Sequence, residues 1–217
     1  MSNNLFFILL NATLQTLYMV GFSALLSAFF GIPLGILLST SKQGGLIEHS
    51  LLYRTLSGIV NIIRSIPFII LVVAIIPLTR LLVGTSIGNN AAIVPLTLGA
   101  IPFIARITEN ALSEISSGLI EAGKTMGANP MQIIVRILLP EALPALINGI
   151  TLTLITLVGY SAMAGAVGAG GLGYLAISYG YEQFNAQIML LTVVILVGLV
   201  QLFQWGGDHL SAKFKHN

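Results

Sequence analysis

Residues 118–125 carry the letters of a nucleotide-binding P-loop, Gly-Leu-Ile-Glu-Ala-Gly-Lys-Thr. That chemistry requires a buried strand before the motif, a flexible loop whose backbone amides surround the phosphates, and a long helix after it. Here the inner residues Leu-Ile-Glu-Ala favour a helix, and Asn129 with Pro130 closes the following helix almost at once. The only aspartate is Asp208, close to the C-terminus, so no apolar strand ends in a metal-binding acid. We therefore expect that the chain is not an enzyme and binds neither ATP nor Mg²⁺.

A second glycine motif, residues 168–173, has the spacing of a dinucleotide-binding turn. It follows an apolar segment and not a strand, and Glu182 is too near to be the acid that binds ribose. A flexible or tightly packed glycine hinge is the favoured interpretation. No metal site, disulfide or Cys nucleophile is expected, because the chain has no cysteine and its histidines are scattered, at His49, His209 and His216.

Three charged residues, Arg64, Arg106 and Glu109, fall inside or at the edge of long apolar segments. Ionisable groups at membrane depth are costly, and they usually face a partner or a water-filled cavity. Arg106 and Glu109 are three residues apart and can pair on one helical face. For all three, structural anchoring or snorkelling to the interface is favoured over contact with a substrate.

The composition indicates a membrane protein. Of 217 residues, 56% are apolar and only 7% are charged, whereas about a quarter of the residues are charged in a typical soluble domain. The net charge of +2 is small and dispersed, which argues against nucleic acid binding. The start, MSNNLFFILLN, lacks the basic flank and cleavage site of a signal peptide, so we expect it to be retained.

A helix that crosses a hydrocarbon core of ~30 Å needs about 20 residues. Residues 1–217 contain no recognisable domain boundary, and five segments can span. We predict an all-α, polytopic membrane helix bundle with spans at 14–39, 56–78, 91–107, 145–167 and 188–205. The second span includes Arg64, because a span restricted to 65–79 is too short. Kinks are expected at Pro67, Pro77, Pro95 and Pro102.

The distribution of basic residues predicts the orientation. With five spans, the side that carries the excess holds Lys42, Arg54, Arg106, Lys124, Arg136, Lys213 and Lys215. The other side holds only Arg80. The N-terminus is therefore expected outside, and the C-terminus and residues 118–140 in the cytoplasm.

Residues 118–140 predict two short helices between the third and fourth spans. Gly118 can be the N-cap of the first helix, with Glu121 at its third position near the positive end of the helix dipole. Gly127 ends this helix. A helix set at an angle between two spans suits a lever that another protein grips. The alternative is an amphipathic helix on the lipid surface.

The second short helix has its own start and stop signals. Asn129 can cap it, with Pro130 first and Gln132 third. Leu139 and Pro140 are expected to end it before the fourth span.

The same stretch resembles the cytoplasmic coupling loop of ABC importer permeases, written EAA, three residues, G, nine residues, I-x-LP. The matching residues are Glu121, Ala122, Gly123, Gly127, Ile137, Leu139 and Pro140. Gly123 departs from the pattern, since the family more often has Ala or Ser there. The resemblance implies that these residues dock a separate ATPase subunit, which would bind the ATP and Mg²⁺.

The resemblance extends over residues 10–205 to the permease of bacterial methionine-uptake ABC importers. It is carried by residues 53–71, 84–106, 139–163 and 165–173. It implies a homodimer of five-span subunits in the bacterial inner membrane. Its expected partners are two cytoplasmic ATP-binding subunits, an extracytoplasmic methionine-binding protein and membrane lipid.

Met163 is a candidate for an outer gate. Between residues 161 and 169 only Met163 and Val167 have bulky side chains, and small residues allow two copies of this span to approach closely. A pair of methionines could then close the path. The alternative is that Met163 fills a packing gap.

Three other functions stay open: a permease for another small solute, an ion- or proton-coupled carrier, and a scaffold without transport. A coupled carrier is disfavoured because no Asp or Glu lies centrally in a predicted span.

Overall fold

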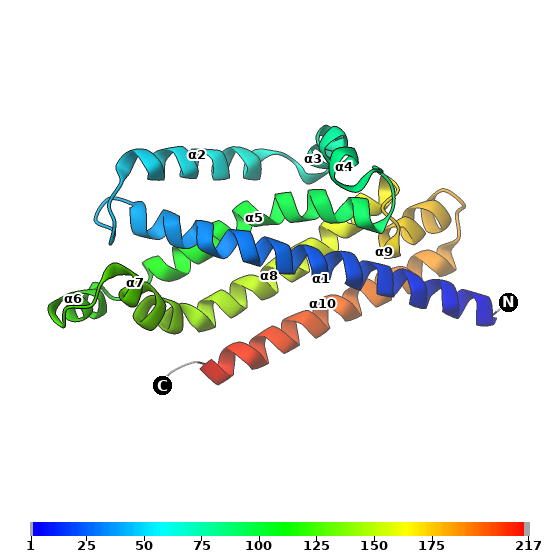
Figure 1. The fold of residues 1–217 in the computed structure, drawn as a ribbon. Coiled ribbons are helices and arrows are strands. Elements are labelled where there is room, and N and C mark those ends of the chain that lie inside the picture. The colour runs from blue at the N-terminus through cyan, green and yellow to red at the C-terminus, as the bar shows by residue number, and fades with distance from the viewer. Residues whose placement is uncertain (1, 215–217) are drawn as a thin grey trace.

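The computed structural model describes residues 2–214, with side chains from residue 5 onward, and shows a helical bundle (Figure 1). In chain order the elements are α1 (Ser2–Ser41), α2 (Ser50–Ser65), α3 (Phe68–Ala74), α4 (Ile76–Val83), α5 (Asn89–Ser113), α6 (Ser117–Thr125), α7 (Pro130–Ile133), the π-helical η1 (Ile134–Leu138), α8 (Leu139–Ala166), α9 (Gly171–Tyr174), the π-helical η2 (Leu175–Tyr181) and α10 (Ala186–Phe214). The prediction of an all-α membrane bundle is confirmed.

Four continuous helical stretches in the described chain are long and apolar enough to cross a membrane. They are 5–41, 89–113, 130–166 and 186–214. Three of them extend beyond the predicted span at both ends, whereas 130–166 starts well before 145 and ends one residue short of 167. The predicted span 56–78 is wrong as a single helix, because α2 and α3 meet at an angle of 101°. Ile66 is extended there, as expected for a residue before proline, and Pro67 precedes α3. The bundle has five spans if this bent pair counts as one.

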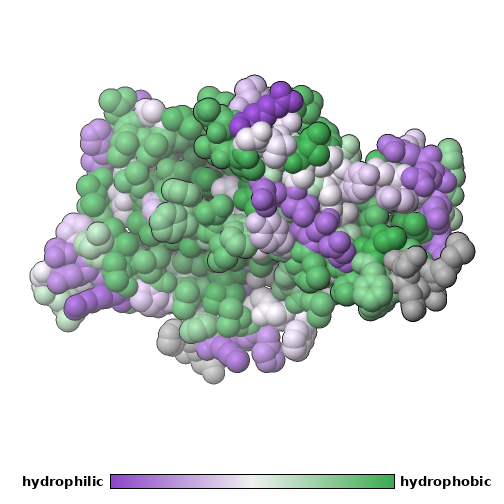
Figure 2. Space-filling model, turned by 45° about the vertical axis from the view of Figure 1, so that its right-hand side comes forward, coloured by the Kyte–Doolittle hydropathy of each residue, from purple (hydrophilic) through white to green (hydrophobic). Residues whose placement is uncertain are grey.

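The surface suits a lipid environment. Figure 2 shows apolar side chains over much of one face, with hydrophilic residues along its edges and in a band across its middle. Large apolar side chains stand outward along α1, including Leu25 (70% exposed) and Phe29 (71% exposed). Such exposure has no rationale in water and is expected where the solvent is hydrocarbon. The first residues of α1 and the end of α10 lie at opposite ends of the bundle (Figure 1).

Helices α1 and α5 pack against each other through glycines. A Cβ at Gly31 would lie 2.9 Å from the Ile101 carbonyl oxygen, and one at Gly35 would lie 2.5 Å from that of Ala105. In lipid, helices associate through such close backbone approach, because apolar surface alone does not favour protein over lipid. The α1–α5 pair is therefore held by contacts that no larger side chain permits.

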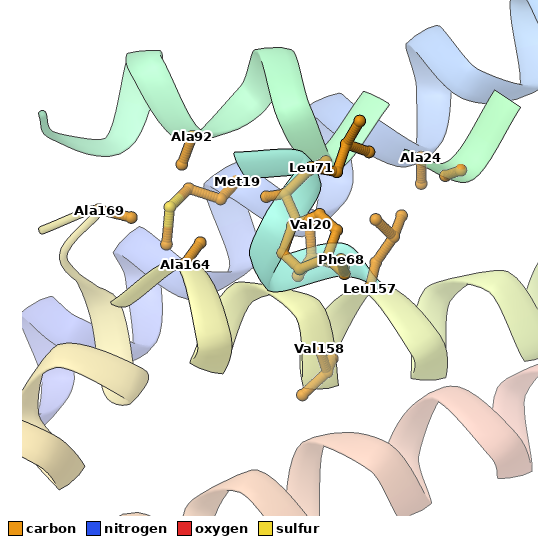
Figure 3. Packing of buried hydrophobic residues seen from close by; sticks show 12 residues of the cluster. Met19, Val20, Ala24, Phe68, Leu71, Ala92, Leu157, Val158, Ala164 and Ala169 are labelled. Carbon is orange, nitrogen blue, oxygen red and sulfur yellow. The ribbon is translucent and has the colours of Figure 1, made fainter. Parts of the chain in front are cut away.

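The main apolar core lies where α1, α3, α5 and α8 meet (Figure 3). Met19 and Leu157 are fully buried in it, and the Phe68 ring stacks on that of Tyr160 with centroids 4.2 Å apart. Because Phe68 begins α3, this core holds the bent α2–α3 segment against the long helices.

We expect Gly35→Ala to destabilise the protein by about 1–3 kcal/mol, because the added methyl group would collide with the backbone of α5. Thermal unfolding of the purified protein measures this. Gly21→Ala is the matched control in the same helix, since a Cβ there meets nothing within 4 Å. Equal stability of the two variants would contradict the role assigned to the glycine contact.

Candidate functional site

The candidate coupling segment is a helix–turn–helix at one end of the bundle, formed by α6, α7 and the turn between them (Figure 1). Helix α6 begins after Ser116, so the prediction of Gly118 as N-cap is wrong. Ser116 has the extended backbone that an N-cap requires, whereas Gly118 is already helical. The P-loop letters at 118–125 therefore lie wholly within a helix, without the loop that phosphate binding needs.

Gly127 ends α6 in a left-handed conformation, with φ of +79°. Its N–H donates to the Lys124 carbonyl at 3.0 Å, and the Ala128 N–H donates to the Gly123 carbonyl at 3.0 Å. This pair of bonds is a Schellman motif, in which glycine is favoured because other residues resist a positive φ. The predicted stop at Gly127 is confirmed.

Asn129 starts the second helix with a complete capping box. Its Oδ1 accepts from the Gln132 N–H at 2.8 Å, and its own N–H donates to Gln132 Oε1 at 2.9 Å. Pro130 occupies the first helical position, where no N–H is needed. The two capped ends fix the direction of the chain on both sides of the turn.

The prediction that Leu139 and Pro140 end the second helix is wrong. Helix α7 continues through η1 into α8, so residues 130–166 form one 37-residue helical stretch. Pro140 lacks an N–H for the Arg136 carbonyl and its ring crowds that group, and the wide π-turn just before it relieves the conflict. The coupling segment is therefore continuous with a membrane-spanning helix.

Helix α6 packs on this continuous helix through its buried Gly123. A Cβ at Gly123 would lie 2.7 Å from Ile137 Cδ1, so the two helices approach closely. Ile120, Ile137 and Leu139 join an apolar cluster with Leu112 of α5. Because the atom in the way is the end of a flexible side chain, Ala at position 123 needs only a small shift of Ile137.

The outward side of the segment is free for a partner. Glu121 and Ala122 are exposed, and Glu121 makes no hydrogen bond or ion pair within the described residues. Three apolar side chains surround this part of the segment, Leu119 (42% exposed), Met126 (87%) and Met131 (67%). We call these five residues the docking surface; its two exposed methionines are of a residue type that is enriched at protein interfaces.

Comparison with known proteins places this chain in a family. A family model described as the binding-protein-dependent transport system inner membrane component matches residues 31–216. The chain belongs to this family. The permease is 56% identical to the probable D-methionine transport system permease protein MetI of Vibrio cholerae, over 96% of this chain and 93% of the relative. It is 58% identical to the D-methionine transport system permease protein MetI of Escherichia coli K12, over 76% of each.

Solved structures of ABC transporters are also similar to this chain. A structure described as an inward-facing conformation of the MetNI methionine ABC transporter contains a chain that is 55% identical to the permease. The match covers 100% of both chains with a TM-score of 0.98. An amino acid ABC transporter with 14% identity has a TM-score of 0.78 over 95% of the permease and 94% of that chain, which shows a shared fold.

The predicted pair of Arg106 and Glu109 is present on α5 of the permease. Arg106 also donates to Ser57 Oγ at 2.6 Å and to Asn61 Oδ1 at 2.9 Å, both on α2. Glu109 is buried, and Arg106 is its ion-pair partner. The pair therefore anchors α2 to α5. The sequence carried no signal for Ser57 and Asn61, because they lie 49 and 45 residues away from Arg106.

The remaining candidate residues from the sequence lie apart from the coupling segment. Arg64 is exposed in the last turn of α2 and not buried in a continuous span. Met163 is 48% exposed on α8.

In the 168–173 motif, the Gly171 N–H donates to Gln15 Oε1 at 2.9 Å, and a Cβ at Gly173 would lie 2.5 Å from the Ala162 carbonyl oxygen. These glycines are packed tightly against other helices. Of the two interpretations of the motif, a flexible hinge or a tightly packed one, the second agrees with the structure.

We expect Gly127→Ala to destabilise the turn by about 1 kcal/mol and to weaken association with the cognate ATPase, because alanine resists the positive φ. Gly118→Ala is the matched control, since it is helical and its Cβ would lie 3.5 Å from Ser116 Oγ. Thermal unfolding and copurification with the ATPase measure both effects. The same loss in both variants would contradict the role of the left-handed turn.

Proposed function

We propose that this permease forms the translocation path of an ATP-driven importer for methionine, in the L-form and also the D-form. The main support for the proposal is the docking surface. A separate ATPase that binds this exposed surface could move the membrane-spanning helix with which the coupling segment is continuous. The cargo is supported by relatives named for D-methionine transport at 56% and 58% identity. A permease for another small solute is the alternative.

The proposed assembly has two copies of this chain, two cytoplasmic ATP-binding subunits that bind ATP and Mg²⁺, and an extracytoplasmic methionine-binding protein. It lies in the bacterial inner membrane, with the N-terminus outside and the C-terminus in the cytoplasm. The excess of basic residues at the coupling end supports this orientation. The position of the start of α1 and the end of α10 at opposite ends of the bundle supports an odd number of crossings (Figure 1).

An outward-facing stripe on α8 supports a second copy as partner. Residues at helical spacing stand away from the chain's own core, among them Leu152, Gly159 and Met163, and Val167 directly after the helix continues the stripe. A Cβ at Gly159 would meet nothing within 4 Å, so a neighbouring helix can approach there. We propose that two such stripes line the path and that Met163 forms its outer gate.

Coupling then follows from rigid-body motion. Closure of the ATPase subunits draws the two docking surfaces together, and Ile137 and Leu139 transmit this movement from α6 to the continuous α7–α8 helix. The stripes move apart on the outer side, and substrate enters from the binding protein. Hydrolysis restores the inward-facing arrangement.

Glu121→Lys tests the docking role. We expect it to abolish methionine uptake, by more than 10-fold, in cells that lack their own importer and carry this permease with its ATPase and binding protein. Glu141→Lys is the control, because Glu141 is exposed in the first turn of α8 and outside the docking surface. Normal uptake by the Glu121 variant would refute the coupling role, and no uptake by the native permease in an intact ATPase complex would refute methionine as cargo.

Met163→Ala tests the gate. We expect more ATP hydrolysed per methionine transported in proteoliposomes, or leakage of methionine without ATP, because a smaller side chain leaves the path incompletely closed. Met189→Ala is the control, since Met189 packs against Gly180 within the same chain. Unchanged leakage and stoichiometry in the Met163 variant would leave it a packing residue only.

A further inference from the structure

A pocket at the bend between α2 and α3 has the features of a small-molecule site. It is lined by Arg64, Phe68, Gly99, Phe103 and Tyr160, together with three aliphatic residues. Its volume is about 210 Å³, below the roughly 300–1,000 Å³ of sites for drug-sized ligands. That volume suits a ligand as small as an amino acid.

The pocket lies at mid-membrane depth. Its floor, Gly99, is ten residues from the start of the 25-residue α5, which is about 15 Å along the helix axis. Tyr160, in its wall, lies three residues before the proposed gate Met163 on α8. A ligand in this pocket would therefore be close to the proposed path.

Arg64 is a cation without an anion in this pocket. It makes no hydrogen bond or ion pair with any residue that the structure describes. The acidic residues of the chain cannot neutralise it, because Glu109 is paired with Arg106 and the others lie in loops, helix ends and α6: Glu48, Glu114, Glu121, Glu141, Glu182 and Asp208. A second copy brings the same set of acids, and Arg64 is exposed, so a bound anionic group can reach it and supply the counter-charge.

The end of α2 supplies an acceptor beside this cation. The carbonyl of Arg64, a residue that lines the pocket, accepts no hydrogen bond from any backbone N–H between residues 2 and 214, because the chain breaks at Ile66 and Pro67. Free carbonyls at a helix C-terminus favour a positive group. One cation and one free carbonyl match the carboxylate and the ammonium of a zwitterion.

Three aromatic residues also line the pocket, and we call them its aromatic wall. Phe68 and Tyr160 are stacked in parallel, 3° apart in plane, and Phe103 completes the wall. Thioether sulfur makes favourable contacts with aromatic rings, so the wall suits an apolar or sulfur-containing side chain.

We propose that this pocket is a transient binding site for the transported amino acid, with Arg64 binding its carboxylate, the end of α2 its ammonium and the aromatic wall its side chain. The proposal rests on the proposed function and adds a substrate contact within the membrane to it. It assigns a ligand to Arg64, for which the sequence favoured structural anchoring or snorkelling over contact with a substrate.

Equilibrium binding to the whole permease–ATPase complex in lipid nanodiscs tests the site, with methionine and with methioninol, which lacks the carboxylate. We expect Arg64→Gln to weaken methionine binding about 10-fold or more and to leave methioninol binding unchanged. Arg64→Lys keeps the charge and gives an intermediate loss. Arg54→Gln is the matched control, because Arg54 is exposed on the same helix and does not line the pocket.

Two outcomes would overturn the site: native methionine affinity in Arg64→Gln, or an equal loss for methionine and methioninol, which marks a structural role. Uptake assays on the same variants separate this from the proposed function. If the native complex transports methionine and Arg64→Gln has an unchanged KM, only the pocket is refuted. If the native complex neither binds nor transports methionine, both proposals fall.

Discussion

Close backbone approach between helices is the constraint on which the rest of this structure depends. In hydrocarbon, burying an apolar side chain between helices gains little over leaving it in lipid, so van der Waals contact between well-fitted surfaces must hold the helices. Gly31 and Gly35 bring α1 onto α5, and Gly173 brings α9 onto α8. With α5 fixed in this way, the Arg106–Glu109 pair can reach α2, and the bend at Pro67 can set Phe68 against Tyr160.

Much of this arrangement was predictable from the sequence. Long apolar segments separated by charged turns gave the helical spans, and the capping residues around Gly127 and Asn129 gave the turn of the coupling segment. The pairing of Arg106 with Glu109 followed from helical spacing alone. These features are local, and local chemistry determines them.

The errors at Pro67 and Pro140 have one cause, which is that proline was interpreted without its tertiary surroundings. Pro67 was expected to kink a helix and instead separates two helices at 101°. Pro140 was expected to end a helix, and a π-turn carries the helix past it. In each case the packing around the proline decides between a kink, a break and a wide turn. The close contact between Gly123 and Ile137 could also not be predicted from the sequence. It explains why glycine is compatible with a position where the family more often has alanine.

The unbroken helix from Pro130 to Ala166 has a mechanical consequence. Its 37 residues extend over about 55 Å, whereas the hydrocarbon core is about 30 Å thick. With its outer end near the far edge of the core, about 25 Å projects beyond the near edge. A rigid rod that pivots at the middle of the core then has arms of about 40 Å and 15 Å. The helix would act as a lever with unequal arms. A large movement of its cytoplasmic end would produce a smaller displacement, with a larger force, at its outer end.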